Sequence, residues 1–432
     1  MMTVVQTSEE DPQLSVVRFT SELSWADAGP EVASPHVERL CIEAQECLVA
    51  GRVLDLASLM LTSADLIFSK VSEKDLECIF TVICNLVTKS ENLDEILEIA
   101  KLISAKVAQQ PNDKPALRLK ILFNLYNLLT IPYGRFSVYM QALNLAVNGK
   151  VAEHIVPSFK KIDGFLKEWN LNLNEQRDLF LAMSNVAKEC KGSAKDSFKF
   201  LIKYLATFSG EDAATMSEAK EQSVKAIIDF LKAPDVFQCD LLDMPAVAQL
   251  ENDSQYSSVY QLLRIFLTQK LDSYLEYHAA NSSLLKDYGL VHEDCVIKMR
   301  LMSLVDLGSS ESGRIPYAVI RDTLQVNTIL SVAFDMPPIP ILTCFLQLND
   351  DEVEFWVVKA ISAKLLDCKM DQMNQVIIVS RCSERVFGQR QWELLRSKLA
   401  TWKENVASVM ATIQVNKIAD DVTQAAQGMA IH

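Results

Sequence analysis

Glycine is scarce in this chain of 432 residues, with only 12 occurrences. So few glycines argue against a β-rich enzyme with many tight turns and favour a helical protein. The ten cysteines include no Cys-x-x-Cys pair, and their positions inside helical patterns are typical of core packing. Long apolar runs are also missing, because the nearest candidate, residues 326–348, contains Asp335 and three prolines. We therefore expect no membrane-spanning helix.

Positive charge is in the minority. Lysine and arginine total 42 against 56 aspartates and glutamates, a net charge of −14. An acidic surface suits a protein that works among protein partners and argues against general nucleic-acid binding. Polar and acidic residues at positions 8–11 interrupt the first positions too early for a signal peptide, so we expect a cytoplasmic protein with reduced thiols.

Motifs that carry chemistry are lacking as well. The chain has no phosphate-binding loop, no dinucleotide glycine fingerprint and no His-Glu-x-x-His zinc motif, and Gly308 to Gly313 lacks the nucleophile-elbow spacing. His292 and Cys295 have the spacing of two metal ligands on one helix face, but no second pair accompanies them, so a solvated helix start is the favoured interpretation. We expect no catalytic residue, no metal site and no cofactor.

Helical periodicity dominates the first two thirds of the chain. Residues 1–35 contain few periodic apolar residues and are interpreted as an extended leader. From residue 36 to 288, apolar residues recur at steps of three and four, and prolines and glycines separate segments of helical length. Helices joined by short loops predict antiparallel pairs stacked in a solenoid, with degenerate repeats because no fixed period is present. The predicted fold class is mainly α.

Residues 289–382 have the pattern of a winged helix, in which helices are followed by a short hairpin. The predicted third helix opens on acids between Asp350 and Glu354, and four β-branched residues follow a polar turn. From Leu290 to Cys382, eight cationic side chains face twelve acidic ones, which a phosphate backbone would repel. Docking of protein is therefore favoured over sequence-specific binding of nucleic acid. The predicted docking strand consists of Val376, Ile377, Ile378 and Val379.

A long helix is predicted over residues 383–415, followed by a flexible tail over 416–432. Its apolar residues alternate steps of three and four, which is typical of a helix that packs against other helices. The helix could fold back on its own winged helix or join an intersubunit bundle, and the length of the seam favours the bundle. The seam consists of Trp392, Leu395, Leu399, Trp402, Val406, Val409 and Ile413.

Several stretches carry a resemblance to a known family over about residues 12 to 415. They are Arg118-Leu-Lys-Ile-Leu-Phe-Asn-Leu, Phe165-Leu-Lys-Glu-Trp-Asn, Lys298-Met-Arg-Leu-Met, Ile315-Pro-Tyr, Asp322-Thr-Leu-Gln, Asp350-Asp-Glu-Val-Glu, Trp356-Val-Val-Lys-Ala-Ile, Lys369-Met-Asp-Gln-Met-Asn-Gln-Val, Arg385-Val-Phe-Gly-Gln and Gln391-Trp. With these motifs the chain resembles the M-subunit family of eukaryotic translation initiation factor 3. Members of this family are PCI-domain proteins, which implies a helical stack capped by a winged helix.

The resemblance implies a noncatalytic scaffold whose partners are other PCI and MPN subunits and, through the complex, the small ribosomal subunit. In such complexes winged helices pair side by side and C-terminal helices form a bundle; the resemblance assigns these roles to residues 376–379, as a sheet edge, and to residues 392–413. Three alternatives stay open: a PCI subunit of the COP9 signalosome or proteasome lid, a winged-helix nucleic-acid binder, and an enzyme.

One segment departs from the family pattern. Removing residues 326–347 joins Leu324-Gln to the Leu-Asn that precedes Asp350, as the family pattern requires. The extra segment carries one charge and three prolines, which forbid a continuous helix. It is either a retained in-frame intron or a genuine apolar insertion within the winged helix. Transcripts sequenced across codons 320 to 352 decide between them, since finding only the long form excludes the intron.

Overall fold

The computed structural model describes residues 11–26, 29–190, 192–309, 313–325, 344–386 and 388–429. The chain folds as two compact units, residues 1–226 and 227–432, with the division inside a helix. The sequence instead placed a boundary at residue 288, just before the winged helix. Within the described residues, no helix is long and apolar enough to span a bilayer.

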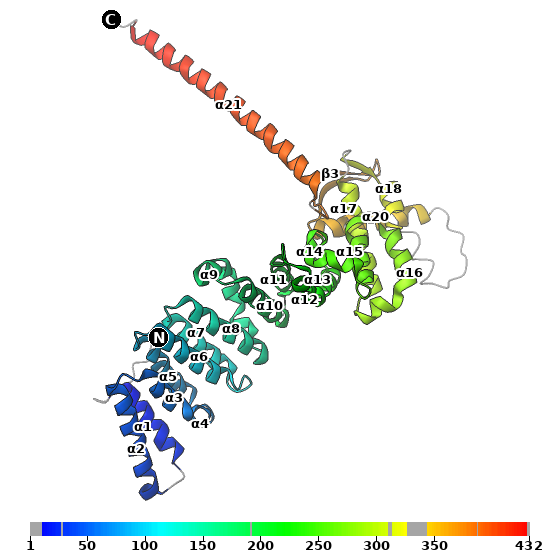
Figure 1. Ribbon diagram of the computed structural model, residues 1–432. Helices are drawn as coiled ribbons and strands as arrows, with labels where there is room; N and C mark the ends of the chain where they lie inside the picture. The colour runs from blue at the N-terminus through cyan, green and yellow to red at the C-terminus, as the bar shows by residue number, and fades with distance from the viewer. Residues whose placement is uncertain are drawn as a thin grey trace. The chain divides into compact units, whose positions relative to one another are not determined.

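The first unit is a stack of helices (Figure 1). Helices that follow one another in the chain pack in pairs, as α1 does with α2, α7 with α8 and α10 with α11. Helices of one pair also contact those of the next, as α8 contacts α10. This arrangement confirms the predicted helical solenoid within the unit. Its elements are α1 (Pro12–Ser24), α2 (Pro30–Val49), α3 (Val53–Thr62), α4 (Ala64–Lys70), α5 (Glu73–Cys84), η1 (Asn85–Thr88), α6 (Leu93–Ala108), α7 (Pro115–Leu128), α8 (Pro132–Asn148), η2 (Ala152–His154), η3 (Val156–Lys161), α9 (Ile162–Trp169), α10 (Leu173–Glu189), α11 (Ala194–Ala206), α12 (Ala213–Glu218) and the start of α13 (Lys220–Lys232).

The predicted extended leader is wrong for the part that the structure describes. Residues 12–24 form α1, whose first residue is a proline. Asp11 is the N-cap, and its side chain accepts a hydrogen bond from the main-chain amide of Gln13. The helix buries Val16 and Val17 together with polar Thr20 and Ser21, whose hydroxyls donate to the Val17 carbonyl. Because polar residues share the buried face, the sequence lacks an apolar stripe there, and packing against α2 and α5 stabilises the helix instead.

Buried cations close helix ends in this unit. The Arg118 side chain of α7 is 1% exposed, and its guanidinium donates to the carbonyls of Val107 at the end of α6 (2.8 Å) and of Asp113 (2.6 Å). The same group lies 3.5 Å from the ring centre of Phe68. A cation at a helix C-terminus satisfies carbonyls that have no partner within the helix, and an aromatic face favours the desolvated charge. Arg118 therefore joins three neighbouring helices of the stack.

The second unit combines further helices with a small sheet (Figure 1). Three helices, α17, α18 and α20, pack on one another and contact strands β3, β1 and β2 respectively, which confirms the winged-helix architecture. The elements are the end of α13, η4 (Leu241–Asp243), α14 (Pro245–Ala248), η5 (Gln249–Asn252), α15 (Ser257–Thr268), α16 (Leu271–Asp287), α17 (His292–Gly308), β1 (Arg314–Pro316), α18 (Tyr317–Leu324), α20 (Cys344–Ser362), β2 (Leu366–Asp371), β3 (Val376–Cys382) and α21 (Gln389–Met429).

The sheet is antiparallel with the order β1-β3-β2. β2 and β3 form the predicted hairpin, with Asp371 opposite Val376 and a bulge between Asp367 and Cys368. β1 pairs with the other side of β3, with Ile315 opposite Ile377. The end of α17 approaches this sheet closely, because a Cβ atom at Gly308 would meet the Leu366 side chain at 2.6 Å. A larger residue at position 308 would require the side chains of Leu366 and Cys382 to shift.

Two helix boundaries differ from the prediction. α20 begins at Cys344, ahead of Asp350, so the acidic residues do not form its first turn. α21 continues to Met429, so residues 416–429 extend the helix where the sequence predicted a flexible tail. Residues 326–343 of the atypical insert lie outside the described residues, and its last four residues belong to α20.

Candidate docking surfaces

Helix α17 forms the centre of the second unit, and most of its side chains are buried, including Lys298 and Arg300. Lys298 is 3% exposed, and its ammonium donates to the carbonyls of Phe230 and Ala233 (2.8 Å to the latter) at the end of α13. It also lies 4.1 Å from the Phe230 ring centre. Burial lowers the pKa of Lys298 to about 7. The buried lysine therefore connects α17 to α13 at a desolvation cost.

This lowered pKa predicts a pH-dependent stability. Above pH 7 the folded state holds fewer protons at Lys298 than the unfolded state, whose pKa is 10.5, so rising pH favours folding. We expect the free energy of unfolding of the wild type, relative to Lys298→Met, to rise by roughly 2 kcal/mol from pH 7 to pH 9. Urea unfolding at pH 7, 8 and 9 measures this difference. Lys369→Met, at an exposed lysine, is the control. If the difference in unfolding free energy between the wild type and Lys298→Met did not change with pH, the lowered pKa of Lys298 would be contradicted.

Arg300, the second buried cation of α17, fixes the third helix of the winged helix. Its guanidinium carbon lies 5.1 Å from the ring centre of Trp356 on α20, and it donates to the carbonyl of Gln325 at the end of α18 (3.2 Å). The ammonium of Lys359 lies 5.1 Å from the same ring. Trp356 thus lies close to two cations, and a single arginine joins α17, α18 and α20.

One of the acidic residues expected at the start of α20, Glu354, binds side chains within the winged helix. Glu354 accepts hydrogen bonds from the Tyr317 hydroxyl (3.2 Å) and from the Gln372 amide (2.9 and 3.0 Å). These contacts connect α20 to α18 and to the turn of the hairpin. On the exposed side of α20 lie Phe355 and Val358, two large apolar residues one turn apart. The outer face of α20 is therefore apolar beside its acids, as expected of a surface for protein.

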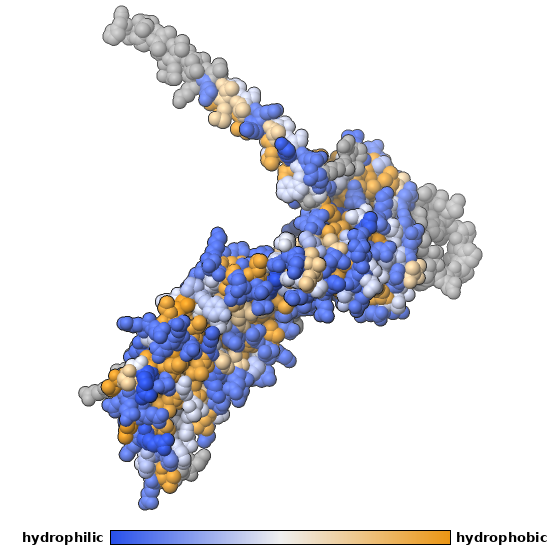
Figure 2. All heavy atoms as spheres, viewed as in Figure 1, coloured by the Kyte–Doolittle hydropathy of each residue, from blue (hydrophilic) through white to orange (hydrophobic). Residues whose placement is uncertain are grey.

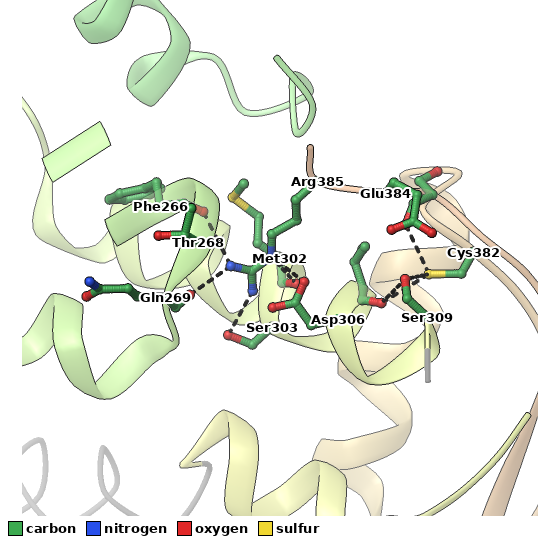
Figure 3. A network of polar contacts seen from close by, with 12 residues as sticks. Phe266, Thr268, Gln269, Met302, Ser303, Asp306, Ser309, Cys382, Glu384 and Arg385 are labelled. Carbon is green, nitrogen blue, oxygen red and sulfur yellow. Dashed lines mark hydrogen bonds and ion pairs between the residues drawn. The ribbon is translucent and has the colours of Figure 1, made fainter. Parts of the chain in front are cut away.

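Arg385 fixes the segment from which α21 departs (Figure 3). Its side chain is 4% exposed, and its Nε donates to the Met302 carbonyl of α17 (2.7 Å). A terminal nitrogen donates to the carbonyls of Gln269 (2.8 Å) and Phe266 (3.4 Å) at the end of α15, and Asp306 lies 3.0 Å from Nε. Burial lowers the pKa of Arg385 to about 10 and raises the pKa of Asp306. One side chain therefore anchors the start of the long helix to two others.

The seam of α21 is exposed. Figure 2 shows apolar residues at intervals along its described part. The seven seam side chains are between 37% and 66% exposed, which is not compatible with a helix folded back on its own winged helix. Two further apolar residues, Leu394 and Met410, are exposed beside the seam. An apolar stripe of about three heptads that faces solvent is an unfilled helix-packing surface.

The predicted docking strand lies elsewhere than expected. Residues 376–379 belong to β3, the central strand, which is paired with β1 on one side and β2 on the other. The prediction of a sheet edge is therefore wrong for these residues, because the three-residue strand β1 occupies the side that the sequence left open. Among the described strands, the edges are β1 and β2. β1 ends in Pro316, which has no amide to donate, whereas β2 offers a six-residue edge.

Ile377 therefore has a packing role. It is fully buried in the middle of the sheet. We expect Ile377→Ala to lower the free energy of unfolding by about 2–4 kcal/mol, because it leaves a cavity between paired strands and α17. Urea unfolding measures this, with the half-buried Val379→Ala as a milder control. Unchanged stability combined with loss of a partner would instead support a direct docking role.

His292 and Cys295, the candidate metal pair, lie on α17 beside Tyr274. His292 stacks on His278 with ring centres 3.8 Å apart, and its Nδ1 lies 3.1 Å from the Tyr274 hydroxyl, while Cys295 is buried. Burial and the neighbouring His278 lower the pKa of His292. Throughout the part of the chain that the structure describes, no three His, Cys, Asp or Glu side chains group as metal ligands.

The structural roles of the buried cations Lys298, Arg300 and Arg385 were not predicted from the sequence. A usable signal was present, because Lys298 and Arg300 interrupt the otherwise apolar run from Cys295 to Met302. Charged side chains in such a run are rarely buried without partners. Their partners are main-chain carbonyls of distant helix ends, which no pattern of side chains in the sequence reveals.

Comparisons with known proteins agree with this arrangement. A family model described as eIF3 subunit M, C-terminal helix, matches residues 385–413, from the anchoring arginine to the end of the seam, and a PCI-domain model matches residues 271–381. Subunit M of eukaryotic translation initiation factor 3 from Dictyostelium discoideum is 34% identical over 349 residues, 80% of each chain. The subunit M of Pongo abelii is 27% identical over 399 residues, 92% of this chain and 97% of the relative. The human subunit M is 27% identical over 343 residues, 79% of this chain and 83% of the relative. On this identity and coverage, the chain belongs to the family of subunit M of eukaryotic translation initiation factor 3.

Proposed function

We propose that this chain is a noncatalytic scaffold subunit of eukaryotic translation initiation factor 3, which assembles with other PCI and MPN subunits and supports formation of initiation complexes on the small ribosomal subunit. The observation that carries the proposal is the exposed seam of α21, which lies within the residues matched by the family's C-terminal helix. An apolar helix face of this length is stabilised when further helices cover it. The chain carries out this function in the cytoplasm.

Two surfaces of the chain bind other subunits. The seam of α21 enters a helical bundle with other subunits, and the winged helix pairs with a neighbouring PCI domain through the outer face of α20 and the β2 edge. Phe355 and Val358 supply apolar area on α20, and β2, an edge among the described strands, can pair with a further strand. The acidic balance of the winged helix supports a protein partner over a nucleic acid. The names of the relatives support this factor over the signalosome or proteasome lid.

Affinity purification tests the proposal. The tagged full chain is isolated from cytosolic extract at moderate salt, and its partners are identified by mass spectrometry. We expect PCI and MPN subunits of the initiation factor together with small-subunit ribosomal proteins. Recovery of signalosome or lid subunits in their place would overturn the proposal. Recovery of chaperones alone would show that the chain with residues 326–347 does not assemble.

A further inference from the structure

Helix α2, at the end of the first unit, has a core face of ordinary character. Ala44 and Cys47 are buried, and α2 packs on α1 and α3. Near its start, His36 stacks on Trp25 at the end of α1 with ring centres 4.2 Å apart. These contacts fix which side of α2 points away from the stack.

The opposite face is also apolar. Pro35, Ile42 and Val49 follow at intervals of seven residues, and at about 100° per residue they lie almost in line, about half a turn away from Ala44 and Cys47. All three are exposed, Ile42 at 58% and Val49 at 84%. A helix with apolar residues on two opposite sides is typical of one that is covered on both.

The position of α2 makes this exposure informative. α1 and α2 form the last pair at their end of the stacked helices (Figure 1). Terminal repeats of a solenoid normally present a polar outer face, because nothing stacks beyond them. A shallow groove of about 410 Å³ runs along this outer face, lined by Ile42, Gln45, Glu46, Val49, Ala50 and Arg52. Among the described residues, α2 therefore presents a shallow apolar surface on the side away from α1 and α3.

Charges around the stripe select its occupant. α2 carries four glutamates, Glu31, Glu38, Glu43 and Glu46, against the single cation Arg39. Arg52, which also lines the groove, is paired with Asp55 at 3.2 Å. Glu38 and Glu46 flank the stripe on opposite sides. Pairing with α2 of a second copy would set these glutamates against one another, which like-charge repulsion disfavours. A partner helix with lysines or arginines beside its apolar face would bind them favourably.

We propose that the outer face of α2 is a second docking surface, which takes an amphipathic helix of another protein, apolar along one side and basic at its flanks. The partner extends the helical stack by one layer. This surface belongs to the first unit and is separate from α20, β2 and α21, so it binds its partner independently of the scaffold contacts proposed above.

Site-specific cross-linking in the assembled complex tests the proposal. The full chain carries p-benzoylphenylalanine in place of Ile42, or in place of Leu93, an exposed apolar residue at the start of α6 that serves as control. After irradiation of the purified complex, mass spectrometry maps the linked peptides. We expect Ile42 to link to one segment of another protein with apolar residues at helical spacing and flanking lysines or arginines. Links to a second copy of this chain, to an acidic segment, or no link would overturn the proposal.

A binding assay with the linked segment completes the test. A synthetic peptide of that segment is titrated into the full chain, and Ile42→Glu with Val49→Glu should weaken binding by at least about tenfold. The matched pair Leu93→Glu with Leu173→Glu places the same charges on other exposed apolar positions of the unit and should leave affinity unchanged. Trp402→Asp in α21 should also leave it unchanged, which separates this surface from the seam. Equal affinity of the α2 variant and the wild type would overturn the proposal.

Discussion

Arg385→Met should lower the free energy of unfolding of the second unit by about 3–5 kcal/mol. The substitution keeps much of the side-chain volume but removes the hydrogen bonds from the guanidinium to the carbonyls of Met302, Phe266 and Gln269, which are buried or partly buried. Unsatisfied buried carbonyls cost more than the net value of the hydrogen bonds lost, because unfolding returns them to water. The half-exposed Asp306 adds little, because solvent screens its charge.

Urea unfolding of the full chain measures the effect, and hydrogen exchange locates it. We expect faster exchange at the end of α15 and at the start of α21. Arg385→Lys should recover only part of the stability, since an ammonium cannot reach both helices with the planar fork of a guanidinium. Arg381→Met, at an exposed arginine near the end of β3, four residues earlier, is the control. A loss no larger than that of the control would show that Arg385 does not anchor α21.

Replacing Trp402 and Val406 of α21 by aspartate should abolish assembly while leaving the chain folded. Both residues are exposed in the structure, at 66% and 59%, so the substitution removes no core contact. Within a bundle, two carboxylates would face apolar side chains without partners, and loss of a buried tryptophan alone typically costs about 2–4 kcal/mol of binding. Recovery of partner subunits should therefore fall at least about thirtyfold.

The control for this variant lies on the other side of the same helix. Ser397 and Ala411 stand opposite the seam in the heptad, and Ser397→Asp with Ala411→Asp adds the same charge to α21. Circular dichroism should show equal helix content for both variants and the wild type. Co-purification of partners measures assembly. Equal recovery with the seam variant and with the control would mean that the seam does not hold the complex together.

Local patterns in the sequence determined much of the secondary structure and the seam of α21, one of the surfaces proposed for docking. Steps of three and four among residues such as Ile96, Ile99 and Ile103 determined the helices of the stack, because helical periodicity depends only on neighbours along the chain. The same periodicity determined the seam of α21, whose exposure follows from a stripe longer than one small domain needs to cover. The run of β-branched residues at 376–379 determined a strand for the same local reason.

Tertiary structure decided what these elements contact. β3 became a central strand because β1, some sixty residues earlier in the chain, pairs with its free side, and strand order depends on such distant pairing. α1 is helical although its buried face mixes Val16 with Thr20 and Ser21, since its neighbours supply the apolar partners. The roles of Lys298, Arg300 and Arg385 depend on carbonyls at the ends of other helices. Every residue has a main-chain carbonyl, so the sequence does not indicate which carbonyls a buried cation will bind. The packing of helix ends against one another decides this.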